Sequence, residues 1–250
     1  MKAELIDSLG TDLTVVNAAR CSFSAVSTEL SKKDIGLINF LARGCMSKDW
    51  DNVIDELAST NWQEDPNGTE CINDILKWAK NMPTHWSPFA HAMITMRETV
   101  PIFVARQRFK HVIGFSYNEV SRRYVDDTPE FHSPGLNGWR ERPVGGIKQG
   151  SGGFHSNSMG HHSRYMSLLE NAQDMYEAMI HDGVAPEQAR MVLPQSMLTT
   201  YWVTGSLYAW ANAFIQRSDP HAQVEIQQLA QQWDEIISPL FPHAWDALTK

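Results

Sequence analysis

Cysteine is scarce in this chain and badly placed for cross-linking. The 250 residues contain three cysteines, Cys21, Cys45 and Cys71, and no pair has the CxxC spacing of a thiolate zinc site. Their odd number also argues against a disulfide framework. The sequence therefore predicts a protein of a reducing compartment, and we expect the cytoplasm.

The chain also lacks an excess of basic residues and a long apolar run. Its 21 Lys and Arg against 29 Asp and Glu give a net charge of -8, which argues against a duplex-DNA binder or a polybasic membrane anchor. Residues 201–215, the most apolar stretch, are too few to span a bilayer, and residues 1–7 are too acidic for a signal peptide. We expect neither a nucleic-acid polymer nor a membrane as partner, so any bound anion must be held by a local cluster.

Several common nucleotide and metal motifs are missing as well. Residues 150–153 lack both the Gly-Lys-Ser/Thr ending of a phosphate loop and the third glycine of a dinucleotide fold. The histidines have no carboxylate or thiol at ligand spacing, so no metal site is expected at His132, His155, His161 and His162. The chain shows no internal repeat and no clear linker, which favours a single domain over residues 1–250.

What is present is a mixture of helical and strand patterns. Ser31 can cap a helix that ends near Gly44, and Ser47 and Thr69 can cap short helices over 48–58 and 70–81. Residues 5–16 favour a strand pair or a strand and a loop. The remaining expected elements are a strand over 92–100, a helix from Pro101 to about Val112, a long loop over 128–157, a strand over 197–204, and helices over 159–182, 186–193, 205–217 and 220–237.

A polar strip is expected on the helix that begins at Pro101. Arg106 with Lys110, and Gln107 with His111, are each one helical turn apart. Two cations on one strip suit an anion, although a solvated outer face is the simpler interpretation.

The segment Ser116-Tyr-Asn-Glu-Val-Ser-Arg-Arg-Tyr124 concentrates further polar groups. Arg122 and Arg123 offer forked donors suited to phosphate, Ser121 offers a hydroxyl, and Glu119 offers an acceptor for a ring or sugar. The simpler alternative is a surface salt bridge between Glu119 and Arg123, which contributes little.

These residues resemble the signature of the flavin-dependent thymidylate synthases, the ThyX family. The literal pattern matches through Arg106, Gln107, Arg108 and Ser116, but the flanking blocks favour a second register. In that register Lys110, His111 and Val112 represent the usual Arg-His-Arg, with one extra residue before the signature serine, Ser121. Four more blocks match in family order: Ala18-Ala-Arg-Cys-Ser-Phe23, His85-Trp-Ser-Pro-Phe89, Ala189-Arg-Met-Val-Leu-Pro194 and Arg217-Ser-Asp-Pro-His-Ala-Gln223. The glycine-rich loop through Lys148 resembles the longer forms of phage members, and the location that the resemblance implies is the cytoplasm of a bacterial or phage-infected cell.

The resemblance implies an α+β fold, a mainly antiparallel sheet flanked by helices, assembled as a homotetramer with shared active sites. It implies reductive methylation of dUMP to dTMP, with methylenetetrahydrofolate as carbon donor and NADPH-reduced FAD as hydride donor. No cysteine nucleophile is needed for this reaction, and the cofactors supply the difficult chemistry.

The family's site residues carry over by position. The implied catalytic residues are Arg217, Ser121 and His85. The implied substrate-binding residues are Gln107, Glu119, Ser121, Arg122, Arg123, Arg190 and Arg217, and the implied flavin-binding residues are Ser22, His85, Ser87, Lys110, His111 and Asn212. Arg123 and Arg190 would neutralise the 5′-phosphate, and Arg217 would stabilise charge on the uracil carbonyl, aided by a helix that begins at Pro220.

Departures from the family pattern leave two rival functions open. Lys110 loses the guanidinium fork, Val112 loses a charge, and the family's acidic and basic flavin positions are occupied by Ala90 and Tyr208. The same fold could transfer a hydroxymethyl group, or act on dCMP in place of dUMP. A nucleotide-binding protein without catalysis is the rival from another class.

Overall fold

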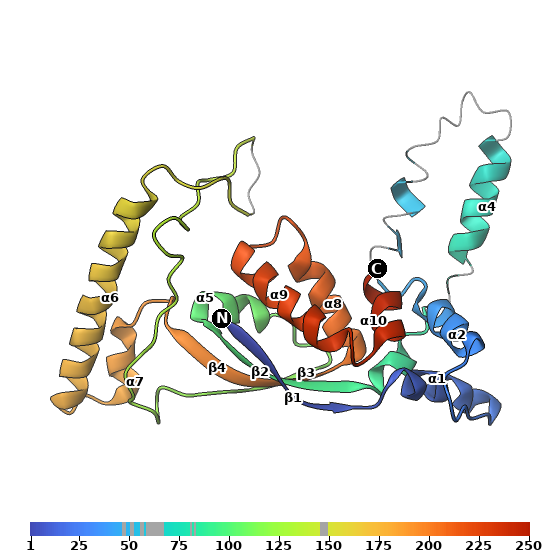
Figure 1. Cartoon of the computed structure of the whole chain (residues 1–250), viewed down its shortest axis with the longest axis horizontal. Helices are drawn as coiled ribbons and strands as arrows, with labels where there is room; N and C mark the ends of the chain where they lie inside the picture. Colours follow the sequence, from blue (N-terminus) through green and yellow to red (C-terminus); the bar gives the residue numbers. More distant parts are fainter. Residues whose placement is uncertain are drawn as a thin grey trace. The chain divides into compact units, whose positions relative to one another are not determined.

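In a computed structural model of the chain, a four-stranded sheet runs through the fold (Figure 1). The structure describes residues 1–46, 49–50, 53–55, 58, 68–80, 82, 84–145 and 150–250. The strands, in the spatial order β1-β2-β4-β3, are β1 (Lys2–Leu9), β2 (Met93–Pro101), β4 (Leu198–Ser206) and β3 (Phe115–Glu119). Among these residues no helix is long and apolar enough to cross a membrane.

The register of β2 against β4 is antiparallel. Thr95 faces Thr204 and Thr99 faces Thr200, with 2.9 Å between the hydroxyl oxygens of each pair. Residue numbers therefore increase along β2 in the direction in which they decrease along β4, as they do in an antiparallel pair. The predicted class, a mainly antiparallel sheet with helices, is confirmed.

The chain forms two compact units, each assembled from separate segments. The first contains residues 1–7, 95–204 and 213–234, and the second contains residues 8–94, 205–212 and 235–250. We describe each unit by itself.

In the first unit, α5 (Ile102–Arg108) and α9 (Val224–Ile237) lie on the same side of the sheet (Figure 1). Alternate residues of β2 and β4 point to the buried face because side chains along a strand alternate between the two faces. The fully or almost fully buried residues there are Met96, Glu98, Val100, Tyr201, Val203, Ile226, Leu229 and Trp233.

A long connection leaves β3 and ends in α6 (Ser158–His181), which packs against α7 (Pro186–Ala189) and the short 3-10 helix η3 (Arg190–Val192). Isolated bridges join Phe131 to Met197 and Arg140 to Phe154. This connection confirms the expected long loop, of which residues 146–149 lie outside the described residues.

In the second unit, caps set where the helices begin. Thr11 and Ser31 each form a capping box, before α1 (Asp12–Arg20) and α2 (Lys32–Ala42). Asp12 accepts hydrogen bonds from the backbone N–H groups of His243 and Ala244, both 2.9 Å, at the start of α10 (Pro242–Thr249). The other elements are η1 (Cys21–Phe23), α4 (Gly68–Lys80) and η2 (Ser87–Ala90), and α8 (Leu207–Ser218) belongs partly to each unit.

Several expected elements are confirmed, and others need correction. The helices over 32–42 and 158–181 and the strands β2 and β4 match their predictions closely. The second half of the expected strand pair over 5–16 is helical, because Thr11 caps α1. The helix over 70–81 corresponds to α4, and Thr69 lies inside it. The helix over 48–58 with its cap Ser47 falls largely outside the described residues, as does Asn81.

Candidate functional site

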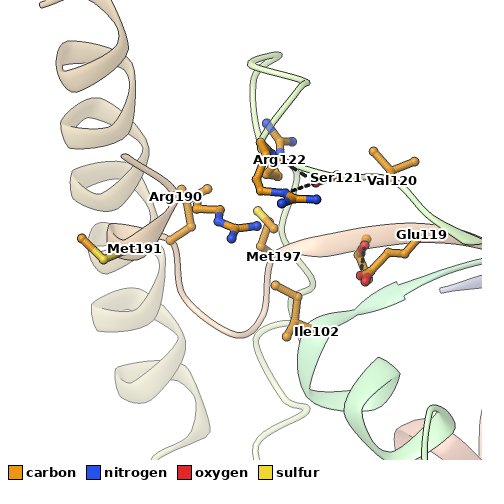
Figure 2. Close-up of a pocket in the computed structure, with 11 residues that line it drawn as sticks. Ile102, Glu119, Val120, Ser121, Arg122, Arg190, Met191 and Met197 are labelled. Atoms are coloured by element: carbon orange, nitrogen blue, oxygen red, sulfur yellow. Dashed lines mark hydrogen bonds between the residues drawn. The ribbon is translucent and has the colours of Figure 1, made fainter. Parts of the chain in front are cut away.

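A cavity of about 540 Å3 opens where β3 ends, in the first unit. Five of the seven residues predicted to bind the substrate line it, and Figure 2 shows the Arg190 side chain reaching from η3 toward Met197 and the turn at Ser121. The lining residues are Ile102, Glu119, Val120, Ser121, Arg122, Arg123, Arg190, Met191, Leu193, Met197 and Thr199. The fold thus brings one segment after β3 and one after α7 to a common cavity.

The backbone after β3 fixes the polar side chains of this cavity. Val120 still pairs with β4, donating its N–H to Thr200 O at 2.9 Å, and the chain then turns so that Tyr124 N donates to Ser121 O at 2.9 Å. Ser121 Oγ accepts from the N–H of Arg123 at 3.3 Å, and Glu119 Oε1 accepts from the Thr199 hydroxyl at 2.7 Å. The alternative surface salt bridge between Glu119 and Arg123 is not among the ion pairs of the described residues.

The three arginines of the cavity differ in their partners. Arg122 forms an ion pair with Asp127 at 2.9 Å, and its guanidinium lies 5.9 Å from the ring of the buried Tyr176. Arg123 lies over the Tyr124 ring at 5.0 Å, and Arg190 Nε donates to the Glu187 carbonyl at 3.3 Å. Neither Arg123 nor Arg190 has a carboxylate partner within the described part of the chain. Two guanidiniums with spare donors beside a hydroxyl form a site for an anion.

A second cavity, of about 590 Å3, lies in the second unit and gathers three predicted flavin residues: Ser22, His85 and Ser87. Its wall is mainly apolar and includes the aromatic rings of Phe23 and Phe40, with Phe40 6.4 Å from the His85 ring. Ser22 follows α1 in η1, whereas Ser87 begins η2 and His85 lies two residues before it. An apolar wall with a few polar groups is the usual lining of a pocket for an aromatic ligand.

Arg20 also lines this second cavity, although it is not among the residues that the sequence predicts for the flavin or the substrate. Its guanidinium donates to Asp34 Oδ1 at 2.6 Å, and the Ser27 hydroxyl donates to the same oxygen at 3.0 Å. Hydrogen bonds from the Ser31 hydroxyl and backbone N–H, followed by those from Arg20 and Ser27, hold the pKa of Asp34 well below its usual range. The signal available in the sequence was the position of Arg20 inside the block 18–23.

A third group of predicted residues meets at the end of α5. Arg217 Nε donates to His111 Nε2 at 2.8 Å, and Arg217 also donates to the Gln107 carbonyl at 3.3 Å. The Gln107 amide in turn donates to the Gln223 side chain at 2.6 Å. The structure therefore brings Arg217, His111 and Gln107 together, apart from the lining of the two cavities.

His111 is a neutral hydrogen-bond acceptor in this group. Burial, followed by the positive charges of Arg217 and Arg108, lowers the pKa of His111 from 6.5 to about 4. Because Nε2 accepts from Arg217, the single proton of the neutral ring belongs on Nδ1. The His111–Arg217 contact is thus a hydrogen bond between a neutral imidazole and a cation.

Two expectations about this region are wrong. The polar strip requires a helix to about Val112, but α5 ends at Arg108, so Lys110 and His111 lie in the turn that follows. A helix from Pro220 would have added its positive end near Arg217, but α9 begins at Val224 and Arg217 occupies the last turn of α8. The dipole at Arg217 is therefore that of a helix C-terminus, which favours the guanidinium itself.

A family model described as thymidylate synthase complementing protein, Thy1, matches residues 4–243. The flavin-dependent thymidylate synthase of Thermotoga neapolitana is 32% identical over 247 residues, which cover 99% of this chain and 90% of that protein. This chain belongs to the ThyX family. The enzyme of the same name from Thermosipho africanus is 36% identical over 168 residues, 66% of this chain and 72% of the relative.

Solved structures agree with the family assignment. A UMP/dUMP methylase, PolB, from Streptomyces cacaoi bound with 5-Br dUMP is 26% identical, with a TM-score of 0.73 and coverage of 99% of this chain and 94% of that chain. The same methylase bound with 5-Br UMP gives a TM-score of 0.72, with 99% and 93% covered. The predicted ThyX-like fold is thus confirmed.

The structure shows the surroundings of three residues that depart from the ThyX pattern, Tyr208, Ala90 and Val112. Tyr208 donates its hydroxyl to the Cys45 carbonyl at 3.1 Å, and its ring centroid lies 5.6 Å from that of Trp86. Ala90 is half-buried at the end of η2, and Val112 is 66% exposed. In this member of the family, the position of Tyr208 therefore contributes aromatic packing in place of a charge.

Three of the predicted flavin residues, Lys110, His111 and Asn212, are not among the residues that line the two cavities. Asn212 lies on α8, half-buried, and its side-chain amide donates to the Tyr208 carbonyl one turn earlier at 3.1 Å. Lys110 is exposed after α5. All three remain predictions from the ThyX resemblance.

Proposed function

We propose that this chain converts dUMP to dTMP as a flavin-dependent thymidylate synthase, with methylenetetrahydrofolate as carbon donor and FAD reduced by NADPH. The shared name of its relatives and the dUMP methylase fold of its structural neighbours support this activity. The observation that carries the proposal is the cavity in which Ser121, Arg123 and Arg190 converge and leave two guanidiniums available for a phosphate.

In this proposal the first cavity holds the nucleotide. Arg123 and Arg190 bind the 5′-phosphate with bidentate, charge-assisted hydrogen bonds, and Ser121 donates a further one. Glu119 accepts from a ring or sugar donor. We assign Ser121 to binding because no general base lies within hydrogen-bond distance of its hydroxyl, which contacts only Arg123 among the described residues.

The second cavity fits a flavin. Its aromatic and aliphatic wall suits the apolar face of a fused ring, and the Ser22 and Ser87 hydroxyls and the His85 imidazole suit its polar edge. When bound, a reduced flavin supplies the hydride of the reaction. Ser22, His85 and Ser87 would hold and orient the ring, and Lys110, His111 and Asn212 are the further residues that the family resemblance assigns to it.

Arg217 is the residue proposed to polarise the pyrimidine. Its guanidinium is half-buried, so a hydrogen bond to a uracil carbonyl would be strong there, and negative charge that develops on that oxygen would be stabilised. His111 stays neutral at physiological pH, so it accepts the Arg217 Nε–H and adds no second positive charge, while the other guanidinium N–H groups of Arg217 remain for the carbonyl. Gln107, anchored by Gln223, would complete this part of the substrate site.

We also propose that the chain acts as a homotetramer whose active sites are shared between subunits. This proposal follows from the family resemblance. Five of the seven predicted nucleotide residues line a cavity in one compact unit of the chain, and the residues of the flavin cavity belong to the other unit.

Product analysis tests the reaction. The purified protein, which should be yellow, is incubated with dUMP, methylenetetrahydrofolate and NADPH, and the nucleotide is identified by mass spectrometry. We expect dTMP. A hydroxymethylated nucleotide, or a product from dCMP only, would favour the alternative chemistries, whereas a colourless protein that binds dUMP without turnover would indicate a non-catalytic binder.

UMP is a second candidate substrate, because the structural neighbour is named a UMP/dUMP methylase. The same assay with equal UMP and dUMP measures the preference directly. We expect dUMP to be the better substrate, as the names of the curated relatives indicate.

A further inference from the structure

A fully buried ion pair lies in the core of the first unit, near the His111–Arg217 group. Glu98 of β2 and Arg108 of α5 have side chains with 0% exposure, and Arg108 Nε lies 3.3 Å from Glu98 Oε2. Tyr201 of β4 donates its hydroxyl to the same carboxylate oxygen. Burying two charges carries a large desolvation cost, and an apolar pair of similar volume often stabilises a core equally well. We therefore look for a function of the Glu98–Arg108 pair other than stabilising the core.

The Arg108 guanidinium is held in one orientation from several sides. Its carbon lies 4.4 Å from the Phe115 ring centroid, 4.8 Å from that of Trp233 and 5.2 Å from that of Tyr117. Aromatic faces attract a guanidinium and restrict its motion. With the Glu98 carboxylate on another side, Arg108 presents its NH1 donor in a fixed direction.

That donor connects the buried pair to the predicted site. Arg108 NH1 donates to Tyr117 Oη at 2.5 Å, so the phenol hydrogen is free to point elsewhere. Tyr117 Oη donates it to the His111 carbonyl at 2.7 Å, with the Arg108 carbonyl a longer alternative at 3.3 Å. His111 lies beyond the last residue of α5 and is followed by the exposed Val112 and Ile113. The Tyr117 hydroxyl is thus a tertiary anchor on the backbone that carries His111.

We propose that Tyr117 is a positioning residue whose hydroxyl, oriented by the Glu98–Arg108 ion pair, fixes the main chain at His111 so that the imidazole meets Arg217. Its importance for flavin and uracil rests on the proposed function, whereas the coupling of Tyr117 to the His111–Arg217 contact does not.

The coupling has a spectroscopic signature in the free protein. The charged groups that act on the His111 ring are Arg217 from α8 and Arg108 from α5, and both oppose its protonation. Losing the anchor would let the ring move toward solvent and away from Arg217, so its pKa would rise from about 4 toward the ordinary value of 6.5.

The experiment compares two isosteric variants of the free protein. Tyr117→Phe removes the anchoring hydroxyl, and Tyr201→Phe removes a hydroxyl from the Glu98 side of the same cluster and leaves the Tyr117–His111 bond intact. The pKa of His111 is measured by NMR titration of the imidazole, with the resonance assigned by its absence in His111→Gln. We expect Tyr117→Phe to raise this pKa by about one unit or more, and Tyr201→Phe to leave it in place while lowering the melting temperature similarly.

An unchanged pKa in Tyr117→Phe, or an equal rise in both variants, would overturn the proposal. Should Tyr117→Phe fail to fold, Arg108→Lys provides the same test, because a lysine keeps the charge but lacks the forked donor that orients Tyr117. The titration needs no substrate or cofactor. Absence of dUMP methylation would therefore refute the proposed function without deciding this inference, and the titration decides it in either case.

Discussion

Three arginines line the cavity at the end of β3, and their neighbours give them different tasks. Arg122 is neutralised by Asp127 and packed over Tyr176, so it holds the turn in place. Arg123 and Arg190 have no carboxylate partner within the described residues and line the cavity. Residue type alone makes the three equivalent, whereas their partners separate structural from binding arginines.

This difference predicts the behaviour of Arg190→Met. Losing one charge-assisted contact of about 1.5 to 3 kcal/mol should weaken dUMP binding by about 10- to 100-fold. Deoxyuridine, which lacks the phosphate, should bind the variant and the unchanged protein equally. Isothermal titration calorimetry with both ligands measures this, and Arg164→Met, at an exposed position on α6, is the matched control. An equal loss of deoxyuridine affinity would show that Arg190 does not contact the phosphate.

The sequence predicts these residues unequally. Ser121, Arg122 and Arg123 are consecutive, so the sequence itself predicts that they lie together. Only the family resemblance of the block 189–194 predicts that Arg190 belongs to the same site. The sequence around Arg108 gives no local signal of its burial, because its partners Glu98 and Trp233 lie on strand β2 and on the distant helix α9. A buried charge is visible only once tertiary contacts are known.

At the scale of elements, the N-terminus of α2 supports the second cavity. Ser31 caps the helix, and its hydroxyl also contacts Asp34, the carboxylate that holds Arg20 in the cavity wall. One short segment therefore begins a helix and positions a lining residue. Asp34 thus takes part in the capping box and also bonds Arg20, a residue of the cavity wall.

Ser31→Ala should therefore destabilise the protein by about 1 kcal/mol, the usual cost of losing a cap. Chemical denaturation followed by circular dichroism measures the free energy of unfolding. Thr28→Ala, at an exposed threonine in the preceding loop, is the control and should change it little. If both variants have the same stability, the cap contributes nothing.

Elements with local signals were predictable, and those set by distant contacts were not. The cap Ser31 predicts α2 from the local sequence. No local cap predicts α10, because the carboxylate that accepts from its first turn is Asp12, more than two hundred residues away. The helix after Pro101 is shorter than expected, since Gly114 adopts a positive φ of 77° and β3 begins at the next residue. Pro101 itself has extended backbone angles and ends β2.

At the scale of the molecule, the predicted site residues are distributed between two compact units. Glu119, Ser121 and Arg190 belong to one, and Ser22 and His85 belong to the other. Both units are built from interleaved segments, which explains why the family blocks extend along nearly the whole chain and why the family model spans residues 4–243. A single domain over residues 1–250 stays a prediction.

Sharing of active sites between subunits predicts complementation between two variants that are each nearly inactive when dUMP is kept well below the dissociation constant of Arg190→Met. Arg190→Met damages the nucleotide cavity and His85→Ala damages the flavin cavity. If each site takes one cavity from each of two copies, random mixed tetramers contain about one quarter of their sites with both cavities intact. Co-refolding or co-expression of the two variants should then restore about a quarter of the dTMP formation of the unaltered protein.

The controls separate sharing from simple stabilisation. Each variant alone, and the same two variants mixed after tetramers have formed, should stay near background, because subunits must exchange to create an intact site. Sedimentation velocity checks that the mixture has the mass of a tetramer. If each site instead draws both cavities from one chain, no mixed assembly contains an intact site, and the co-expressed sample would be as inactive as its parents. That result would place the complete active site within one copy.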